Sequence, residues 1–474
     1  MATASGSSSS SSTPKRQRVA ETPPPPLPSP PAVETDMLMS LPPEILDTIL
    51  DRVPFRKLLT TTCLSQAWRY RWESIPNLDI DLPQEVSARV LWQCAASAPD
   101  NAVGIRSFHA RVSGNTHFLR VASWLRALSR KGVQALILDF DNCVLDPKPP
   151  ILLGSALFSC AALVRLALND CRMPPAPAGF PGFPKLASLY LSNVALMFKG
   201  GGAQVEHLIG AAPDLNFLSL SYVVTKPLGD EGEAAKWFIR APKLRTLVIM
   251  IQFEDNGCRI GEEEFPLLED ASISIDCLIG TQDGLHFFRR VAGVKKLWFD
   301  IESNMFIVNP LEEITWKFDN LRKAHLCATF GQLPSFMSIV SLLRCAPHIE
   351  HLSIEAEDDI ESTDQFEIYE VLNLETSDDL FASLKFVSLS GIKHYSNQMS
   401  FMKFILFKAV SLQAFVVTFS YHKTNVWYEQ ACRELEEWRS MASPQVSFIP
   451  MLTDESNSII DDGETIEDSD DGSE

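Results

Sequence analysis

The sequence predicts an α/β protein, in which three short helices precede an irregular solenoid of parallel strands with helices or loops on its convex face. Two observations predict this fold. Residues 37–83 divide at prolines into three apolar helical segments, and a short apolar pattern then recurs twelve times between residues 105 and 417. With 474 residues, 46% of them hydrophobic, the chain can bury more than one core. The expected order is a Ser/Pro-rich tail, the helical segment, the solenoid, a C-terminal cap and an acidic tail (1–36, 37–83, 84–400, 401–451 and 452–474).

The first helix of residues 37–83 is expected to begin after Ser40 and to end before Pro54. Pro42 and Pro43 suit a first helical turn, because a missing N–H leaves no bond unmade there. Apolar side chains then recur at helical spacing through residues 45–53 and form one stripe. Pro54 ends the helix, since its ring and its lack of an N–H cannot continue the hydrogen-bond ladder.

A second helix is expected over about residues 55–64, and a third from about Ser65 onward. Trp68 and Trp72 lie four residues apart in the third helix, so they share one face. About forty-five residues are too few to bury three such helices on their own. The apolar side chains therefore predict a surface for a partner protein.

In this order the residues resemble an F-box, the module that docks the Skp-family adaptor of cullin-based SCF ubiquitin ligases. The Leu41-Pro42 opening, the Val53-Pro54 stop, Ser65 and the Trp-Arg-Tyr-x-Trp close stand at the family's spacing. The resemblance implies that the adaptor is bound by Leu41, Pro42, Ile45, Leu46, Ile49, Leu58, Leu59, Cys63, Leu64, Trp68 and Trp72. Leu41, Pro42 and the two tryptophans are the expected anchors, because buried aromatic side chains dominate interface energies. The alternative is an ordinary helical start to a larger domain, with these residues in that domain's own core.

The recurring pattern is L-x-x-L-x-L, with other apolar residues in place of some leucines. Its twelve copies begin at Ile105, Val133, Leu163, Leu186, Leu215, Leu244, Leu268, Val294, Leu321, Ile349, Leu384 and Leu412. Successive copies start 23 to 35 residues apart, which resembles the period of leucine-rich repeats. The alternating x-L-x-L is typical of a strand with one buried face, and stacked strands of this kind bury a continuous core. The alternative is a twisted α/β domain whose strands are evenly spaced.

Residues 118–128 and 204–211 are candidates for helices on the convex face. In the cap, residues 401–451, an apolar helix and a strand precede a charged amphipathic helix over residues 428–441. The stretch ELEEWRSMASPQVSFI resembles the close of the FBD domain, which caps many plant F-box/leucine-rich-repeat proteins. A polar-faced cap is what the end of a solenoid needs.

The formal net charge is −19, and residues 451–474 hold ten acidic residues and no basic one. The rest of the chain is only mildly acidic, which argues against nucleic acid as a partner, because nucleic-acid binding needs a concentrated basic face. No uncharged apolar run of 18 residues occurs, so no membrane partner is expected. The first residues also lack the apolar core of a secretory signal. Both tails are expected to be disordered.

The ten cysteines are dispersed without a C-x-x-C pair, which is typical of reduced core cysteines in an intracellular protein. The expected location is the nucleus and/or the cytoplasm. Residues 14–18, PKRQR, are a weak nuclear import motif, and a solvated charge run explains them better.

No catalytic residue, metal site or cofactor is expected. His348 and His351 flank the start of an expected strand, with no third ligand at metal-site spacing. The glycine-rich turn at residues 199–202 lacks the G-K-[ST] that holds phosphate in a P-loop. No G-x-S-x-G nucleophile motif occurs either.

The F-box and leucine-rich-repeat resemblances together imply a substrate-receptor subunit of an SCF ubiquitin ligase, which is not itself an enzyme. Such a subunit binds the Skp-family adaptor through its F-box, reaches a cullin through that adaptor, and holds a target protein, here unknown, on the strand face of its repeats. Two alternatives stay open: a non-ligase F-box scaffold protein, and an enzyme built on an α/β scaffold. A small molecule that bridges receptor and target is a further option, and no residue of the sequence identifies one.

Overall fold

The computed structural model describes residues 38, 40–61, 63–66, 68, 78–82, 105–113, 118–141, 150–226, 235–250, 257–260, 265–274, 287–300, 311, 314–357, 381–420, 426–442 and 447–452. Contacts divide the chain into two compact units, Met1–Ile49 and Leu50–Glu474. The predicted disordered tails, residues 1–36 and 452–474, lie outside the described residues apart from Leu452.

The first predicted helix is α1 (Pro43–Asp51), and the second is α2 (Phe55–Thr61). Helix α2 is shorter than predicted: Leu64 lies in a turn after it, where its N–H bonds to the Thr61 carbonyl at 3.0 Å. Hydroxyls of Thr60 and Thr61 donate to the carbonyls of Lys57 and Leu58 at 2.7 and 2.6 Å, and such bonds compete with helix continuation. Most of the predicted third helix lies outside the described residues.

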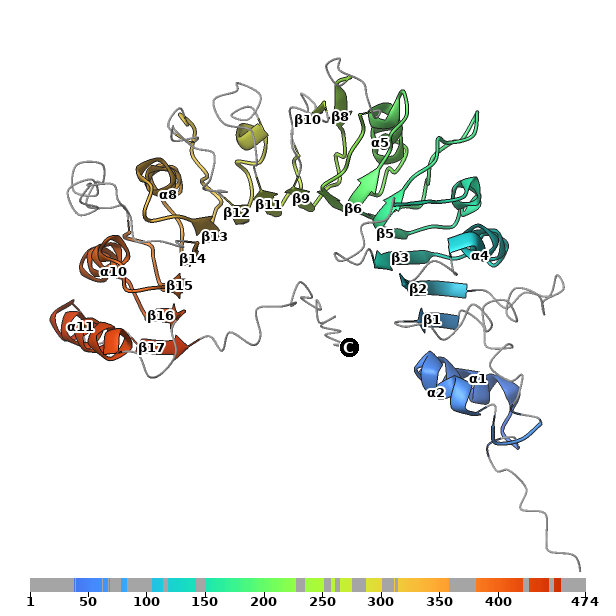
Figure 1. The fold of residues 1–474 in the computed structure, drawn as a ribbon, viewed down its shortest axis with the longest axis horizontal. Coiled ribbons are helices and arrows are strands. Elements are labelled where there is room, and N and C mark those ends of the chain that lie inside the picture. Colours follow the sequence, from blue (N-terminus) through green and yellow to red (C-terminus); the bar gives the residue numbers. More distant parts are fainter. Residues whose placement is uncertain are drawn as a thin grey trace, which may run out of the picture. The chain divides into compact units, whose positions relative to one another are not determined.

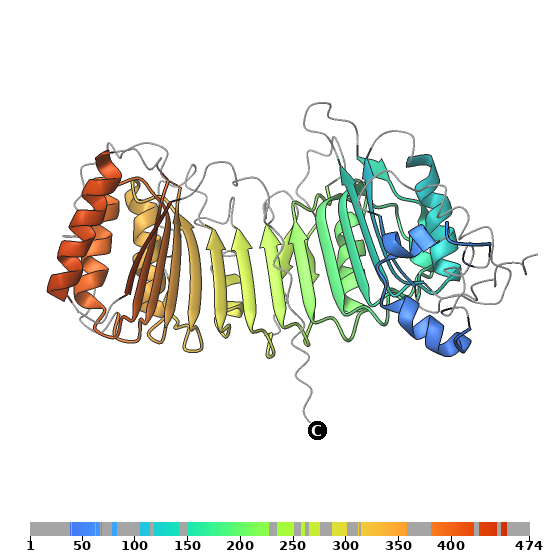
Figure 2. The ribbon, with the colours of Figure 1, turned by 90° about the horizontal axis from the view of Figure 1, so that it is seen from below.

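The second unit is built on one parallel sheet of 15 strands, whose arrows all point the same way in Figure 2. In spatial order the strands are β1 (Leu78–Leu82), β2 (Ile105–Ser113), β3 (Ala135–Asp141), β5 (Arg165–Arg172), β6 (Ser188–Ala195), β7 (Phe217–Ser221), β9 (Thr246–Met250), β11 (Asp270–Ser274), β12 (Lys296–Asp300), β13 (Lys323–Ala328), β14 (His351–Ala356), β15 (Phe386–Ile392), β16 (Ala414–Phe419) and β17 (Ser447–Leu452), with the short β4 (Ile151–Leu152) on β5. Each of the twelve predicted repeats supplies one strand from β2 to β16. The predicted parallel solenoid is therefore confirmed.

The repeats form one continuous core because equivalent leucines of successive strands lie in register. Leu166 faces Leu189, Leu189 faces Leu218 and Leu218 faces Leu247, and all four are completely buried. The leucines of a single repeat cannot be buried without neighbours. In a stack of repeats, the leucines of adjacent strands cover one another and form a continuous core. The regular spacing of the leucines is thus the direct cause of the long sheet.

Strand β1 was not predicted. Residues 78–82 were assigned to the helical segment 37–83, but they pair in parallel with β2 and open the sheet. The other end also differs, because β17 pairs with β16 and continues the same sheet. The architecture therefore does not change at residue 400, where the cap was predicted to begin.

In the part of the chain that the structure describes, helices cover the face of the sheet opposite to the one that carries the candidate site, and Figure 1 shows them on the outer, convex side of the strands. Among them are α4 (Phe118–Arg130), α5 (Gly201–Gly210), α8 (Leu333–Cys345), α10 (Ser396–Lys408) and α11 (Val426–Ala442). A short 3-10 helix, η2 (Ser155–Ser159), lies beside α4. The helices predicted over residues 118–128, 204–211 and 428–441 are confirmed as α4, α5 and α11. In α11, Ala431 and Leu435 are fully buried while Glu436 and Glu437 are exposed, as a polar-faced cap requires.

Two outer features have no counterpart among the sequence-based predictions. Helix α8 is buried on nearly all sides, including its three serines, so it has no exposed polar face of the kind that marks an amphipathic helix. Strands β8 (Trp237–Ile239) and β10 (Cys258–Ile260) form a separate two-stranded parallel sheet. In the part of the chain that the structure describes, no helix is long and apolar enough to cross a bilayer.

The glycine-rich turn at residues 199–202 serves packing. Gly200 has a positive φ of 93° just before α5. A Cβ on Gly201 would collide with the backbone oxygen of Leu196, and one on Gly202 with the indole of Trp237. These glycines let α5 approach its neighbours closely.

A pair of glycines in α5 tests this packing argument. We expect Gly201→Ala to lower the free energy of unfolding by about 1–3 kcal/mol, because the new methyl group meets backbone that cannot move aside. Gly210→Ala is the control, since nothing lies within 4 Å of its added Cβ, and it should raise stability by about 0.5 kcal/mol. Urea denaturation followed by circular dichroism measures both. Equal effects of the two substitutions would contradict the argument.

Candidate functional site

The uncovered face of the sheet presents three rows of side chains, because alternate residues of each strand point away from the core. Between β9 and β16 the first row, at the start of the strands, is Thr246, Asp270, Lys296, Lys323, His351, Phe386 and Ala414. The middle row is Val248, Ser272, Trp298, His325, Ser353, Ser388 and Val416. The third row, at the end of the strands, is Met250, Ser274, Asp300, Cys327, Glu355 and Ser390.

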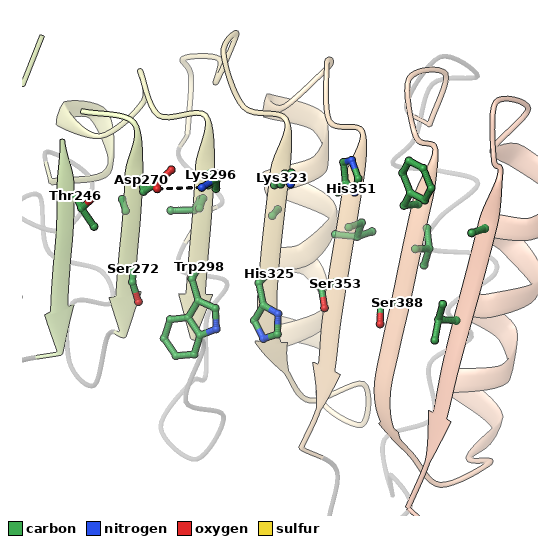
Figure 3. A pocket seen from close by; sticks show the side chains of 18 residues that line it. Thr246, Asp270, Ser272, Lys296, Trp298, Lys323, His325, His351, Ser353 and Ser388 are labelled. Carbon is green, nitrogen blue, oxygen red and sulfur yellow. Dashed lines mark hydrogen bonds and ion pairs between the residues drawn. The ribbon is translucent and has the colours of Figure 1, made fainter. Parts of the chain in front are cut away.

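A groove of about 540 Å³ lies over the first two rows, on strands β9 and β11–β16. Figure 3 shows Lys323 between Lys296 and His351 in the first row, and Trp298 beside His325 in the middle row. Seven strands contribute side chains to this groove. It is therefore a property of the stacked repeats and not of one loop.

Stacked rings form much of the groove's surface. The rings of Trp298 and His325 lie nearly parallel, at 13° with centroids 5.9 Å apart. His351 stacks on Phe386 at 16° and 4.5 Å. Each ring is held flat by its neighbour on the next strand, as expected of cross-strand aromatic pairs. The groove thus offers fixed flat surfaces to planar or apolar groups of a ligand.

The start of the strands also carries an excess of positive charge. We call the following residues the basic edge: Arg245, Glu269, Asp270, Lys295, Lys296, Arg322, Lys323, Glu350 and Lys385. Six cations and three carboxylates give this edge a net charge of +3, in a chain whose net charge is −19. A local charge of this sign attracts acidic segments of a partner and repels basic ones.

The carboxylates of the basic edge are each paired with a cation. The pairs are Arg245–Glu269, Lys295–Glu269, Lys296–Asp270 and Lys385–Glu350, with N–O distances of 3.4, 3.3, 3.2 and 2.9 Å. The hydrogen bond from Lys385 lowers the pKa of Glu350. Because these pairs are largely exposed, they add little stability. They place each carboxylate of the basic edge beside a cation, and the remaining cations give the edge its net positive charge.

His351 is neutral in this environment. Burial, and next the nearby charge of Lys323, lowers the pKa of its imidazole. At neutral pH it therefore contributes a flat ring, and in acid it adds a positive charge to the groove.

The structure separates the predicted adaptor-binding residues by exposure. Pro42, Ile45, Ile49, Cys63 and Leu64 are exposed, the last to 67%, and Leu41 is partly exposed. Leu46, Leu58 and Trp68 are buried, to 3%, 1% and 2% exposure, so they pack inside the protein in this structure. The side chain of Leu59 and the whole of Trp72 lie outside the described residues. Trp68 is therefore not on the exposed surface of the protein alone, and contact of the predicted residues with an adaptor stays a prediction.

The groove residues were not identified from the sequence, although a signal for them exists. Trp298 and His325 occupy the x of the L-x-L in their repeats, the position that points away from the core. Aromatic residues at successive x positions indicate an apolar surface on the strand face. The prediction that His351 flanks a repeat is confirmed, since it lies at the start of β14.

Comparison with known proteins finds two family models and several plant relatives that resemble this chain. The F-box domain model matches residues 38–79, and the model of FBD-associated F-box protein At5g56370, LRR repeats, matches residues 121–297. F-box/FBD/LRR-repeat protein At1g13570 of Arabidopsis thaliana is 28% identical over 51% of this chain, and the chain spans only 54% of its length. FBD-associated F-box protein At5g60610 of the same plant is 23% identical over 80% of this chain and 98% of its own.

A further plant relative and a solved structure complete the comparison. F-box/FBD/LRR-repeat protein At1g51370 of Arabidopsis thaliana is 24% identical over 82% of this chain and 91% of its own. The match to a solved leucine-rich-repeat protein of Leptospira interrogans covers 80% of this chain and 79% of that protein, at 12% identity and a TM-score of 0.32. The chain thus matches an F-box model and a model of leucine-rich repeats of the FBD-associated kind, and it is similar to the F-box/FBD/LRR-repeat proteins of Arabidopsis.

Proposed function

We propose that the protein is the target-binding subunit of an SCF-type ubiquitin ligase. The proposal rests on one observation. The same chain matches an F-box at residues 38–79 and has a repeat sheet whose strand face forms a groove. An F-box implies a Skp-type adaptor in general. A cullin then joins through the adaptor, and ubiquitin transfer is done by enzymes that the cullin brings. The protein itself supplies binding and no catalytic residue, and it acts in the nucleus and/or the cytoplasm.

The groove is the proposed target site. Its rings accept aromatic or apolar side chains, and its basic edge attracts carboxylates. An extended target segment that crosses several strands would meet both features at once. The target is therefore expected to present an acidic segment that also contains aromatic residues.

The adaptor step can be tested with two exposed positions. Ile45→Ser and Leu64→Ser change side chains that are 51% and 67% exposed, so both variants should fold. Each is expected to reduce recovery of a purified Skp-family adaptor by about tenfold, because each removes an apolar contact from the adaptor interface. Val410→Ser is the control: it removes an apolar side chain that is 82% exposed, outside the F-box. Pull-down with adaptor and cullin, after circular dichroism of each variant, measures recovery.

The same pull-down separates the alternatives. Recovery of adaptor and cullin by the wild type supports the ligase receptor. Recovery of the adaptor without the cullin favours a non-ligase F-box scaffold. If the wild type recovers neither, or if Val410→Ser loses as much as the F-box variants, the proposal is wrong.

A further inference from the structure

Three side chains with metal-binding atoms converge at the ends of β13 and β14. His325 and Cys327 stand two residues apart on β13 and so point to the same face. Cys327 is in register with Glu355 on β14. The Cys327 sulfur lies 3.8 Å from the His325 Nε2 and 3.9 Å from the Glu355 Oε2, and these two last atoms are 3.8 Å apart.

These distances form a nearly equilateral triangle. The centre of such a triangle lies about 2.2 Å from each corner, close to the bond lengths of about 2.0–2.3 Å that zinc makes with nitrogen, sulfur and oxygen. The three donors therefore stand where a small ion would need them, without rearrangement of the strands. Thiolate, imidazole and carboxylate are also the ligand types that zinc prefers, whereas magnesium and calcium favour oxygen alone.

The same residues do not form a nucleophilic triad. In a triad the thiol contacts one ring nitrogen of histidine and the carboxylate contacts the other. Here the thiol of Cys327 and the carboxylate of Glu355 both approach Nε2 of His325. Three donor atoms that surround one point, as these do, are typical of a metal site.

The surroundings favour a cation. Asp300 and Glu357 form, with the same Cys327, a second set of donor atoms that lie within 4.8 Å of one another. Three carboxylates thus surround one buried sulfur. A divalent cation at the centre would turn this repulsive arrangement into an attractive one.

We propose that His325, Cys327 and Glu355 bind a Zn²⁺ ion at the end of β13 and β14, with a fourth coordination position open toward the strand face. The side chains of His325 and Glu355 are 33% and 54% exposed, so the ion is reachable from solvent. On binding, Cys327 forms a bond from sulfur to zinc and releases its proton to solvent, one proton for each ion bound. Water, or a donor atom of a bound target, completes the tetrahedron.

Cobalt is the first probe, because Co²⁺ bound to a thiolate has a charge-transfer absorption in the near ultraviolet. Full-length protein, stripped with a chelator, is titrated with Co²⁺ and then with Zn²⁺. We expect the absorption in the wild type, its displacement by Zn²⁺, and its loss in Cys327→Ser. Cys432→Ser, which removes a partly exposed thiol on α11, is the control and should keep the absorption.

Zinc affinity is then measured by competition with a coloured chelator. We expect His325→Gln and Glu355→Gln to weaken Zn²⁺ binding at least about tenfold. Glu436→Gln, at an exposed carboxylate on α11, should leave the affinity unchanged. Because one thiol proton is released, the dissociation constant should fall about tenfold for each pH unit near neutrality.

The outcomes decide the proposal. It is overturned if the wild type shows no thiolate-to-cobalt absorption, if the absorption survives in a folded Cys327→Ser, or if Cys432→Ser loses it. Should Cys327→Ser fail to fold, the exposed positions His325 and Glu355 decide instead, since unchanged zinc affinity in both variants would also overturn it. None of these results depends on the adaptor or on the target, so the zinc site and the ligase role can fail separately.

Discussion

Phe336→Ala is expected to lower the free energy of unfolding of the repeat unit by about 3–5 kcal/mol. Phe336 of α8 is completely buried and contacts Phe330 and Phe401, with ring centroids 6.3 and 5.8 Å away. Phe330 and Phe401 are themselves 5.2 Å apart. Since Phe401 belongs to α10, this cluster joins two neighbouring helices of the convex face. Removal of one ring leaves a cavity that the rigid sheet below cannot fill.

Phe407→Ala is the matched control. Phe407 also lies on α10 but is 44% exposed, so its loss should cost less than about 1 kcal/mol. Urea denaturation of both variants, followed by circular dichroism, measures the difference. If the two variants unfold at the same urea concentration, the aromatic cluster does not hold the helices together. If a first urea transition of Phe336→Ala removes only part of the circular dichroism signal, the repeats near α8 unfold separately from the rest, as one-dimensional repeat arrays can.

The parallel strands could be predicted from the sequence because one pattern determines them. Each L-x-x-L-x-L unit places its leucines in the core, and the twelve units all become strands in register. Helix α8 could not be found in the same way, because it is buried on nearly all sides and lacks the exposed charged face of an amphipathic helix. Strand β1 had a readable signal, the alternation Leu-Asp-Ile-Asp-Leu of residues 78–82. It was missed because those residues directly follow a strong helical motif.

The groove and the proposed zinc site depend on register between strands. Cys327 and Glu355 are 28 residues apart, and only the pairing of β13 with β14 brings them together. Once the repeats are aligned on their leucines, this register can be read from the sequence. The positions of the side chains cannot, because the stacking of Trp298 on His325 depends on rotamers. Cys327 is buried, as predicted for the dispersed cysteines, but its position 3.8 Å from Nε2 of His325 depends on rotamers as well.

The strand face is expected to select acidic peptides, and Lys323→Glu should reverse that preference. Lys323 lines the groove in the first row between Lys296 and His351 (Figure 3). We expect a displayed peptide library to yield, on the wild type, sequences that combine Asp or Glu with aromatic residues. Lys323→Glu should bind the selected peptides about tenfold to a hundredfold more weakly, since an attraction becomes a repulsion at the same place. Lys185→Glu, at an exposed lysine outside the groove, is the control of equal charge change.

The pH dependence gives an independent signature of the same groove. Because burial lowers the pKa of His351, this ring gains its charge only below the pH at which an ordinary histidine does. Peptide carboxylates stay ionised there, so affinity for an acidic peptide should rise between about pH 7.5 and about pH 5.5. His351→Gln should remove that rise while it keeps a planar group against Phe386. Two results together would contradict this role of the groove: a wild-type affinity that does not change with pH, and unchanged binding by Lys323→Glu. Acidic segments would then be recognised elsewhere on the repeats.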